Sequence, residues 1–113
     1  MILVATNDLF FRTKIEEVAK QKNAKIIFVE NFDQILDKDV HTLIVDLNFE
    51  NFEPIESVKK VKKFQPHVHV IGYLSHIQKA LQEDAIRAGC DEILPRSDFS
   101  KSLADILAKS NNL

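Results

Sequence analysis

The sequence contains few of the residues from which common cofactor and redox sites are built. It has one cysteine, Cys90, which excludes a disulfide within the chain and a cluster of thiolate metal ligands. It has two glycines, Gly72 and Gly89, so it cannot form a Gly-rich phosphate-binding loop. P-loop NTPases and Rossmann dehydrogenases are therefore set aside.

Long apolar runs and a strong charge bias are also missing. No apolar stretch approaches the ~20 residues that a membrane span needs. The N-terminus does not combine a basic segment with a long apolar run, so we expect no membrane association and a cytoplasmic location. The net charge of −2 provides no general attraction to nucleic acid.

The size and composition that remain are those of one globular domain. The chain has 113 residues, of which 45% are hydrophobic and 28% are charged. These values are typical of a folded protein with one core, and they leave too little chain for a second domain. We expect residues 1–113 to form a single domain.

Short apolar runs alternate with longer amphipathic segments. The first run, Ile2–Ala5, is continuously apolar, which is typical of a strand buried on both faces. The other predicted strands cover residues 25–29, 42–45, 68–74 and 92–94.

Each predicted strand is followed by a segment with apolar residues at helical spacing. Pro54 is a favoured first helical residue, Gly89 is a favoured residue to end a helix, and Asn31 is a good cap for a short helix. Phe64 is expected on the apolar face of its helix. The five predicted helices cover residues 9–22, 31–36, 54–64, 77–88 and 99–107.

This alternation of strand and helix predicts an α/β fold with a parallel sheet and helices on both faces. For this length we expect a flavodoxin-like three-layer sandwich, with five parallel strands in the order 2-1-3-4-5. In such sheets, ligands bind at the carboxyl ends of the strands, where the strand order reverses.

That rule selects a small set of polar residues, because each follows a predicted strand. They are Thr6, Asn7, Asp46, Ser75 and Arg96. Asp46 is central, since it ends the most apolar strand and is expected to be rigidly held and partly buried.

Three segments resemble the receiver domains of two-component response regulators. Leu43–Leu47 (LIVDL) resembles the phosphoacceptor strand, and Tyr73–Ser75 resembles the fourth strand with its switch hydroxyl. Ala88–Arg96 (AGCDEILPR) is similar to the Ala-Gly-Ala-Asp-Asp-Tyr-Leu-Pro-Lys run of many receivers. The resemblance covers essentially the whole chain. It implies that Asp46 is the phosphoacceptor, that Ser75 is the switch hydroxyl, and that Arg96 replaces the lysine that pairs with the phosphoryl group.

The acids that hold Mg²⁺ in receivers are missing. Counted back from Arg12, which fits the arginine of the first receiver helix, their positions hold Thr6 and Asn7, and Asp8 falls one residue late. In a receiver, a cation offsets the repulsion between the aspartate and the phosphoryl group. Mg²⁺ is recruited mainly by carboxylates, so we expect weak binding at most, and no other cofactor. The candidate ligands are Asn7, Asp46 and Asn48.

Purely structural interpretations of the same residues remain open. Arg96 can grip a carboxylate with two hydrogen bonds, so we also expect a preset pair between Arg96 and Asp46 that lowers the pKa of Asp46. Asp46 is then either a phosphoacceptor or the acid of that pair. Ser75 is either a switch hydroxyl or the N-cap of the following helix.

Other groups of residues have simpler interpretations. Phe49 and Phe52 lie in the loop beside Asp46, where we expect them to cover the site or contact a partner. Cys90 is expected to be a small core residue. One cluster of lysines is predicted to form a solvated helix face, namely Lys59, Lys60, Lys62 and Lys63. Three histidines lie near one another in the sequence, but their spacing matches no zinc-binding pattern, namely His67, His69 and His76.

The leading functional prediction is an atypical (pseudo) receiver, a signalling domain that is not an enzyme and acts through protein–protein interaction. The resemblance implies a protein partner, either a histidine kinase or a downstream signalling protein, and a homodimer through the last two strand–helix units. One alternative is an active single-domain receiver, phosphorylated on Asp46 by a histidine kinase, and the Thr6–Asn7 pair argues against it. Another is a small-molecule-binding flavodoxin-like domain, for which the sequence offers no Gly-rich loop and no nucleophile–base pair.

Overall fold

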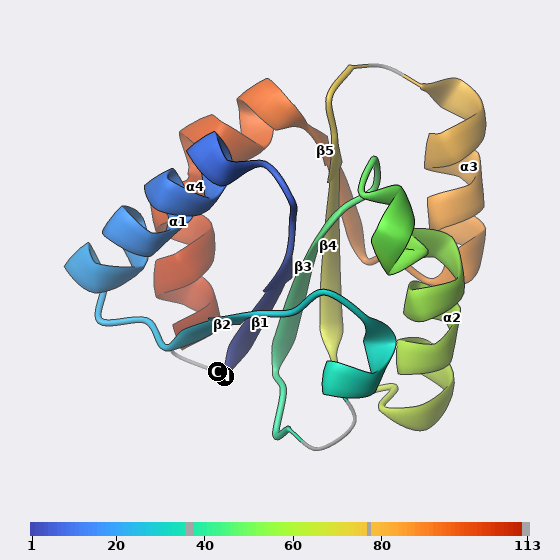
Figure 1. Cartoon of the computed structure of the whole chain (residues 1–113), viewed down its shortest axis with the longest axis horizontal. Coiled ribbons are helices and arrows are strands. Elements are labelled where there is room, and N and C mark those ends of the chain that lie inside the picture. The colour runs from blue at the N-terminus through green and yellow to red at the C-terminus, as the bar shows by residue number, and fades with distance from the viewer. Residues whose placement is uncertain (36–37, 77, 112–113) are drawn as a thin grey trace.

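The computed structural model of the chain describes residues 1–35, 38–76 and 78–111. Its centre is one parallel sheet with the strand order β2-β1-β3-β4-β5 (Figure 1). This order confirms the predicted flavodoxin-like topology. The strands are β1 (Ile2–Ala5), β2 (Ile26–Phe28), β3 (Thr42–Asp46), β4 (His69–Leu74) and β5 (Glu92–Pro95).

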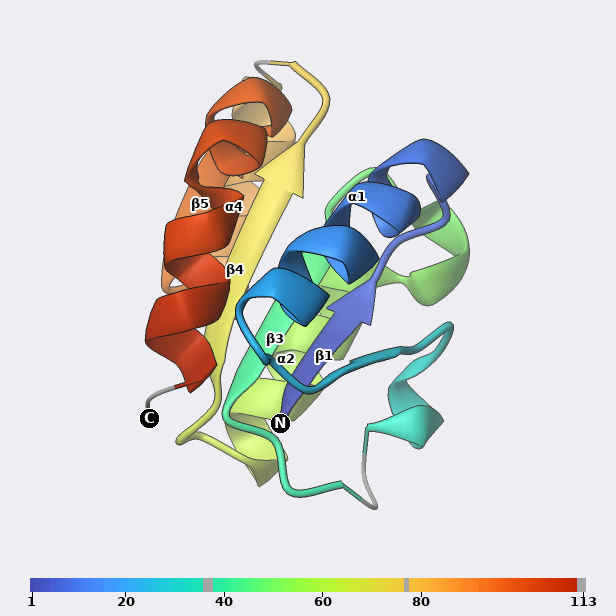
Figure 2. The same cartoon turned by 90° about the vertical axis from the view of Figure 1, so that its left-hand side faces the viewer.

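In the described ranges, four α-helices cover the two faces of the sheet, as predicted for a three-layer sandwich. Two of them, α1 and α4, lie on one face, and α2 and α3 lie on the other (Figures 1 and 2). None of the helices in the described ranges is long and apolar enough to cross a membrane. Their bounds are α1 Leu9–Gln21, α2 Pro54–Phe64, α3 Lys79–Ala88 and α4 Arg96–Asn111.

The second predicted helix is only one turn of 3₁₀ helix, Phe32–Gln34. Asn31 caps it as expected, since its side-chain oxygen accepts a hydrogen bond from the N–H of Gln34 at 3.2 Å. A 3₁₀ turn has poorer hydrogen-bond geometry than an α-helix and rarely extends beyond 3–4 residues. Leu36, which was expected on this helix, lies outside the described residues.

The strands are buried on both faces, as their continuous apolar sequence predicts. Leu3 and Leu43 face α2 and α3, whereas Val4 and Ile44 face α1 and α4. The α1–α4 side also contains an aromatic cluster. In it, Tyr73 stacks on Phe99 with ring centroids 4.7 Å apart, and Phe11 meets both rings edge-on.

The helix boundaries follow from local residue chemistry. Pro54 is the first residue of α2, as predicted. Gly89 ends α3 with a φ of 115°, a conformation that residues with a side chain rarely adopt. A Cβ atom at Gly89 would also lie 2.7 Å from Cγ of Lys62, so both conformation and space require glycine.

Some side chains lie elsewhere than expected. Phe64 is 60% exposed, because it is the last residue of α2 and projects beyond the core. Phe49 and Phe52 do not cover the site but are buried in the α2–α3 core, with ring centroids 6.0 Å apart. Lys62 is not simply solvated, since its ammonium donates to the carbonyl of Val68 at 2.7 Å. Cys90 is half-buried against the core, and burial raises the pKa of its thiol to about 12.

Candidate functional site

Asp46 is the last residue of β3 and lies at the carboxyl end of the sheet. Its side chain is only 9% exposed, and its Oδ1 accepts a hydrogen bond from the N–H of Asn48 at 2.9 Å. Burial raises the pKa of Asp46 above its usual value, and the nearby carboxylate of Asp8 raises it further. The Asn48 N–H and the charge of Arg96 offset this shift only in part.

Arg96 pairs with Asp8, and the predicted pair with Asp46 is wrong. The guanidinium donates to Oδ2 of Asp8 at 2.5 Å and lies over the ring of Phe11, 4.8 Å from its centroid. Over the described part of the chain, it makes no ion pair with Asp46. Without a direct pair, the charge of Arg96 lowers the pKa of Asp46 less than burial raises it.

The position of Asp8 explains this choice of partner. Asp8 is the N-cap of α1, since its Oδ1 accepts from the N–H of Phe11 at 3.1 Å. Its second oxygen is thereby placed beside Arg96, the first residue of α4.

Thr6, at the position of a missing acid, serves the buried aromatic cluster. Its hydroxyl accepts from the hydroxyl of Tyr73 at 2.9 Å and from the N–H of Asp8 at 3.2 Å. Thr6 is 4% exposed and Tyr73 is 1% exposed, so this contact satisfies polar atoms that water does not reach. Asn7, the neighbouring candidate ligand, is exposed.

Asn48 links the loop after β3 to the loop after β4. Its side-chain oxygen accepts from the N–H of Ser75 at 2.9 Å, and its side-chain nitrogen donates to Gln78 at 2.7 Å. The N-cap of α3 is Gln78, so the interpretation of Ser75 as the cap is wrong. The Ser75 hydroxyl instead lies 3.1 Å from Nδ1 of His76 at the surface.

The oxygens around Asp46 fit Mg²⁺ poorly. Both carboxylate oxygens of Asp8 accept hydrogen bonds, and so does the side-chain oxygen of Asn48. Within the described ranges, no group of three or more His, Cys, Asp or Glu side chains could hold a metal ion. Of the predicted ligands, Asn7, one oxygen of Asp46 and the backbone carbonyl of Asn48 remain, and Asp46 alone among them is a carboxylate, whereas Mg²⁺ is recruited mainly by carboxylate charge.

Sequence reasoning missed two contributors to this region. Asp8 was weighed as a ligand only as an acid one residue late, and the fixed carboxylate that its helix-capping position implies was not connected with Arg96. Tyr73 was treated as part of a strand motif. A buried tyrosine needs a partner for its hydroxyl, and that signal pointed toward Thr6 or another polar residue at the same end of the sheet.

A five-stranded, doubly wound sheet with a buried aspartate where the strand order reverses defines the class of fold. No protein-family model matches the chain. No curated protein sequence matches it either. Solved structures do, and 185 chains match.

The receiver domain of NtrX from Brucella abortus superposes with a TM-score of 0.81 at 15% identity, covering 99% of this chain and 98% of that one. The BeF₃-activated receiver domain of DrrB gives 0.80 at 16% identity, with 99% and 97% covered. A response regulator from Burkholderia pseudomallei, with a phosphorylated aspartic acid, a calcium ion and citrate, gives 0.77 at 16% identity, with 98% and 68% covered. The fold is therefore that of response-regulator receiver domains, and identities this low concern the fold alone.

Proposed function

We propose that the chain is a signalling domain of receiver type that acts as an atypical receiver, through protein–protein contacts and without a phosphorylation cycle of its own. The observation that carries this proposal is the pairing of Arg96 with Asp8. Among the described residues, the cation whose charge acts on Asp46 is Arg96, and it is already matched by the carboxylate of Asp8.

The chemistry of phosphoryl transfer to aspartate supports this proposal. The attacking carboxylate must be ionised, and positive charge must offset its repulsion from the phosphoryl oxygens. Burial raises the pKa of Asp46, which disfavours the ionised form. Thr6 brings no charge, and its hydroxyl is occupied by Tyr73 and Asp8.

The proposed partner is another signalling protein in the cytoplasm, either a histidine kinase or a downstream component, and we expect no catalytic turnover. A homodimer through the last two strand–helix units belongs to the same proposal. On this part of the molecule β5 is an edge strand, and Ile86 of α3 is 58% exposed. An exposed isoleucine beside an unpaired strand edge is suitable for such a contact.

One observation favours the alternative of an active receiver phosphorylated on Asp46. Asp8 lies close enough to influence the pKa of Asp46, so a second carboxylate is present although it occurs one residue later in the sequence than expected. If Asp8 releases Arg96, the two carboxylates and the guanidinium supply the charges that phosphoryl transfer requires.

Intact-mass measurement after incubation with acetyl phosphate and Mg²⁺ separates the two functions. We expect the mass to stay unchanged, both for the native chain and for Asp46→Asn. A single phosphoryl adduct that is absent from Asp46→Asn would overturn the proposal in favour of the active receiver.

Asp8→Asn is a matched variant, because asparagine can still cap α1 but cannot hold Arg96 as an ion pair. The variant frees Arg96, so it tests whether the pair itself keeps Asp46 unphosphorylated. If Asp8→Asn gains an adduct that the native chain lacks, the Asp8–Arg96 pair is what blocks phosphorylation, and the native chain remains an atypical receiver.

A further inference from the structure

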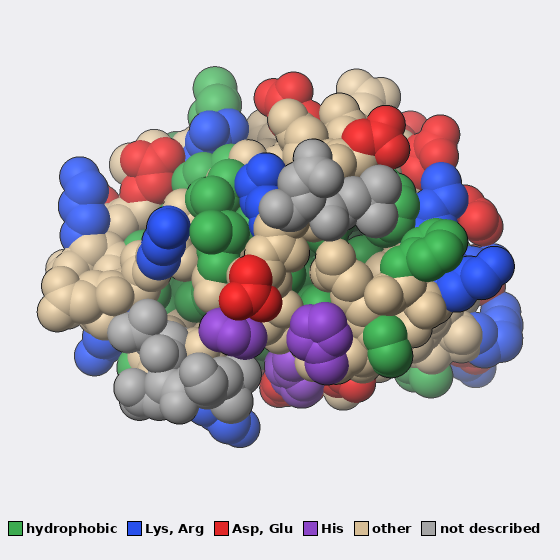
Figure 3. Space-filling model, turned by 90° about the horizontal axis from the view of Figure 1, so that it is seen from below, with side chains coloured by type: hydrophobic (Ala, Val, Ile, Leu, Met, Phe, Trp, Pro, Cys, Tyr) green, Lys and Arg blue, Asp and Glu red, His purple; other side chains and the backbone are tan. Residues whose placement is uncertain are grey.

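A pocket of about 590 Å³ opens at the amino end of the sheet, opposite Asp46. Figure 3 shows this end of the molecule, where histidine side chains gather. Two of the histidines lie two residues apart at the start of β4, and the pairing of β3 with β4 brings the third, just before β3, beside them. They are His41, His67 and His69.

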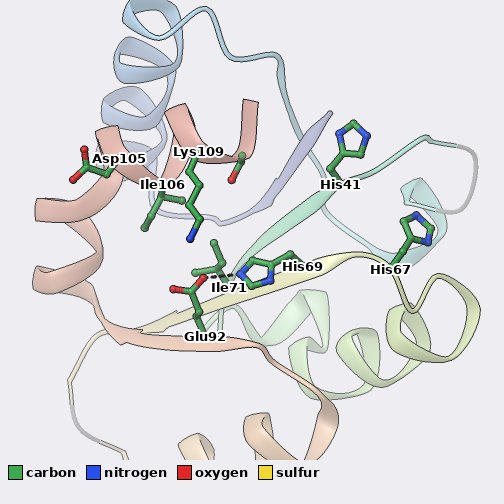
Figure 4. A pocket seen from close by; sticks show the side chains of 9 residues that line it. His41, His67, His69, Ile71, Glu92, Asp105, Ile106 and Lys109 are labelled. Atoms are coloured by element: carbon green, nitrogen blue, oxygen red, sulfur yellow. Dashed lines mark hydrogen bonds and ion pairs between the residues drawn. The ribbon is translucent and has the colours of Figure 1, made fainter. Parts of the chain in front are cut away.

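The strand register builds the floor of the pocket. Ile71 of β4 lies beside Glu92 of β5, and two residues earlier His69 lies beside Thr42 of β3. All four residues are therefore on the sheet face that α4 covers. From above, α4 contributes Ile106 (Figure 4), so Ile71 and Ile106 form an apolar centre between polar ends.

One cation of the pocket has no partner among the described residues. Lys109 of α4 makes no hydrogen bond or ion pair there, and Figure 4 shows it directed toward His69 and Ile71. The two acids of the pocket do not neutralise it. Oε2 of Glu92 lies 2.6 Å from Nε2 of His69, and Asp105 points away from the pocket. A carboxylate only accepts, so Nε2 of His69 donates to Glu92, which directs that carboxylate toward His69 and not toward Lys109.

A buried polar atom next to the pocket is also unsatisfied. Thr42 is 0% exposed, and its hydroxyl has no hydrogen-bond partner. It lies beside His69 on the same sheet face. Buried hydroxyls are rarely left unpaired, but Thr42 does not line the pocket, so this atom is shielded from anything that binds there.

We propose that this pocket binds a small organic carboxylate, with its apolar or aromatic group between Ile71 and Ile106 and its carboxylate on Lys109. A hydrogen bond between two charged groups is among the strongest available to such a ligand. The volume of the pocket lies within the range of small-molecule sites, and its apolar centre is surrounded by polar groups that can fix the orientation of a ligand. The site is at the opposite end of the sheet from Asp46, so this proposal does not depend on the function proposed above.

NMR titration with benzoate tests the proposal, with benzamide and inorganic phosphate as comparisons. Benzamide has the same ring without the charge, and phosphate has charge without an apolar group. We expect benzoate to shift the imidazole signals of His41, His67 and His69 saturably, while His76, at the other end of the sheet, stays unchanged. Benzoate should bind about tenfold more tightly than benzamide, the ratio that about 1.4 kcal/mol provides. Phosphate should cause no saturable shift.

Lys109→Gln and Lys101→Gln form a matched pair of variants. Both lysines are exposed on α4, but only Lys109 lines the pocket. We expect Lys109→Gln to weaken benzoate binding about tenfold and to leave benzamide binding unchanged, and Lys101→Gln to change neither. No saturable shift with benzoate, equal affinity for benzoate and benzamide, or equal effects of the two variants would each overturn the proposal.

Discussion

The two ends of the sheet shift the pKa of an aspartate in opposite directions. At the carboxyl end, burial raises the pKa of Asp46, so the folded state disfavours its charge. At the amino end, burial also acts against the charge of Asp91, but hydrogen bonds from Lys62 (2.6 Å) and from the N–H of Val70 (2.8 Å) outweigh it, and the pKa is lowered.

The comparison separates a structural acid from a candidate functional one. Asp91 stabilises the fold because it is charged, since it ties α2 and β4 to the start of β5. The charged form of Asp46, by contrast, destabilises the folded state, because its carboxylate is buried. A titratable group kept at the expense of stability is a reasonable candidate for function, which here means recognition by a partner or phosphorylation.

The largest expected effect concerns the aromatic cluster beneath the carboxyl end. Phe99 is 0% exposed and contacts both Tyr73 and Phe11. Phe99→Ala should lower the free energy of unfolding by about 3–5 kcal/mol, measured by urea denaturation. Phe64→Ala, at the exposed end of α2, is the control and should change it by about 0.5 kcal/mol or less. Equal losses in the two variants would contradict the assignment of the core.

The hydrogen bond between Thr6 and Tyr73 should have an intermediate and asymmetric effect. Thr6→Val leaves both the Tyr73 hydroxyl and the N–H of Asp8 without their acceptor, so we expect a loss of about 1–3 kcal/mol in unfolding free energy. Tyr73→Phe removes only the donor and leaves Thr6 bonded to Asp8. It should cost less than Thr6→Val in the same denaturation experiment, and the reverse order would show that the Thr6 hydroxyl is not the shared acceptor.

The two aspartates should respond to pH with opposite signs. A folded-state pKa above the usual 3.8 means that Asp46 contributes stability only at low pH and loses it as pH rises through that pKa. Asp46→Asn should therefore raise the melting temperature by a few degrees at pH 7, with a gain that shrinks as the carboxyl becomes protonated. The measurement is thermal unfolding of both proteins as a function of pH, from below 3.8 to neutral pH.

Asp91→Asn is the counterpart in the same experiment. Its lowered pKa means that the stabilisation is present above pH 3.8 and is lost as pH falls through the folded-state value. The side chain is 36% exposed, so solvent screening limits the expected loss at pH 7 to about 1 kcal/mol. If Asp46→Asn were less stable than the native chain at pH 7, the charge of Asp46 would stabilise the folded state, as that of Asp91 does, and the contrast between the two ends would be wrong.

The sequence allowed the sheet to be predicted but not the pairing of its charges. Continuous apolar runs identified the strands, and Pro54 and Gly89 marked helix boundaries, because these signals depend on local backbone chemistry. The partner of Arg96 depended on which of two carboxylates lay within reach of its long side chain. That choice was decided by the capping geometry of Asp8, a property of three-dimensional structure.

The amino-end pocket was beyond sequence reasoning for a similar reason. His41 is 28 positions before His69, and they become neighbours only through the pairing of β3 with β4. The same limit applied to Phe49 and Phe52. A loop position suggested exposure, but the 3₁₀ turn that contains Phe52 (Glu50–Phe52) directs this ring into the core.

The smallest expected effect compares two lysines at the amino end. Lys62 is 22% exposed and donates to Asp91 and to the carbonyl of Val68, so Lys62→Gln should cost about 1 kcal/mol of unfolding free energy. Lys109 has no partner in the described part of the chain, and Lys109→Gln should change that free energy by about 0.5 kcal/mol or less. Denaturation of both variants in parallel measures the difference. Equal losses would mean that Lys109 supports the fold, whereas the expected contrast leaves its charge available to a ligand.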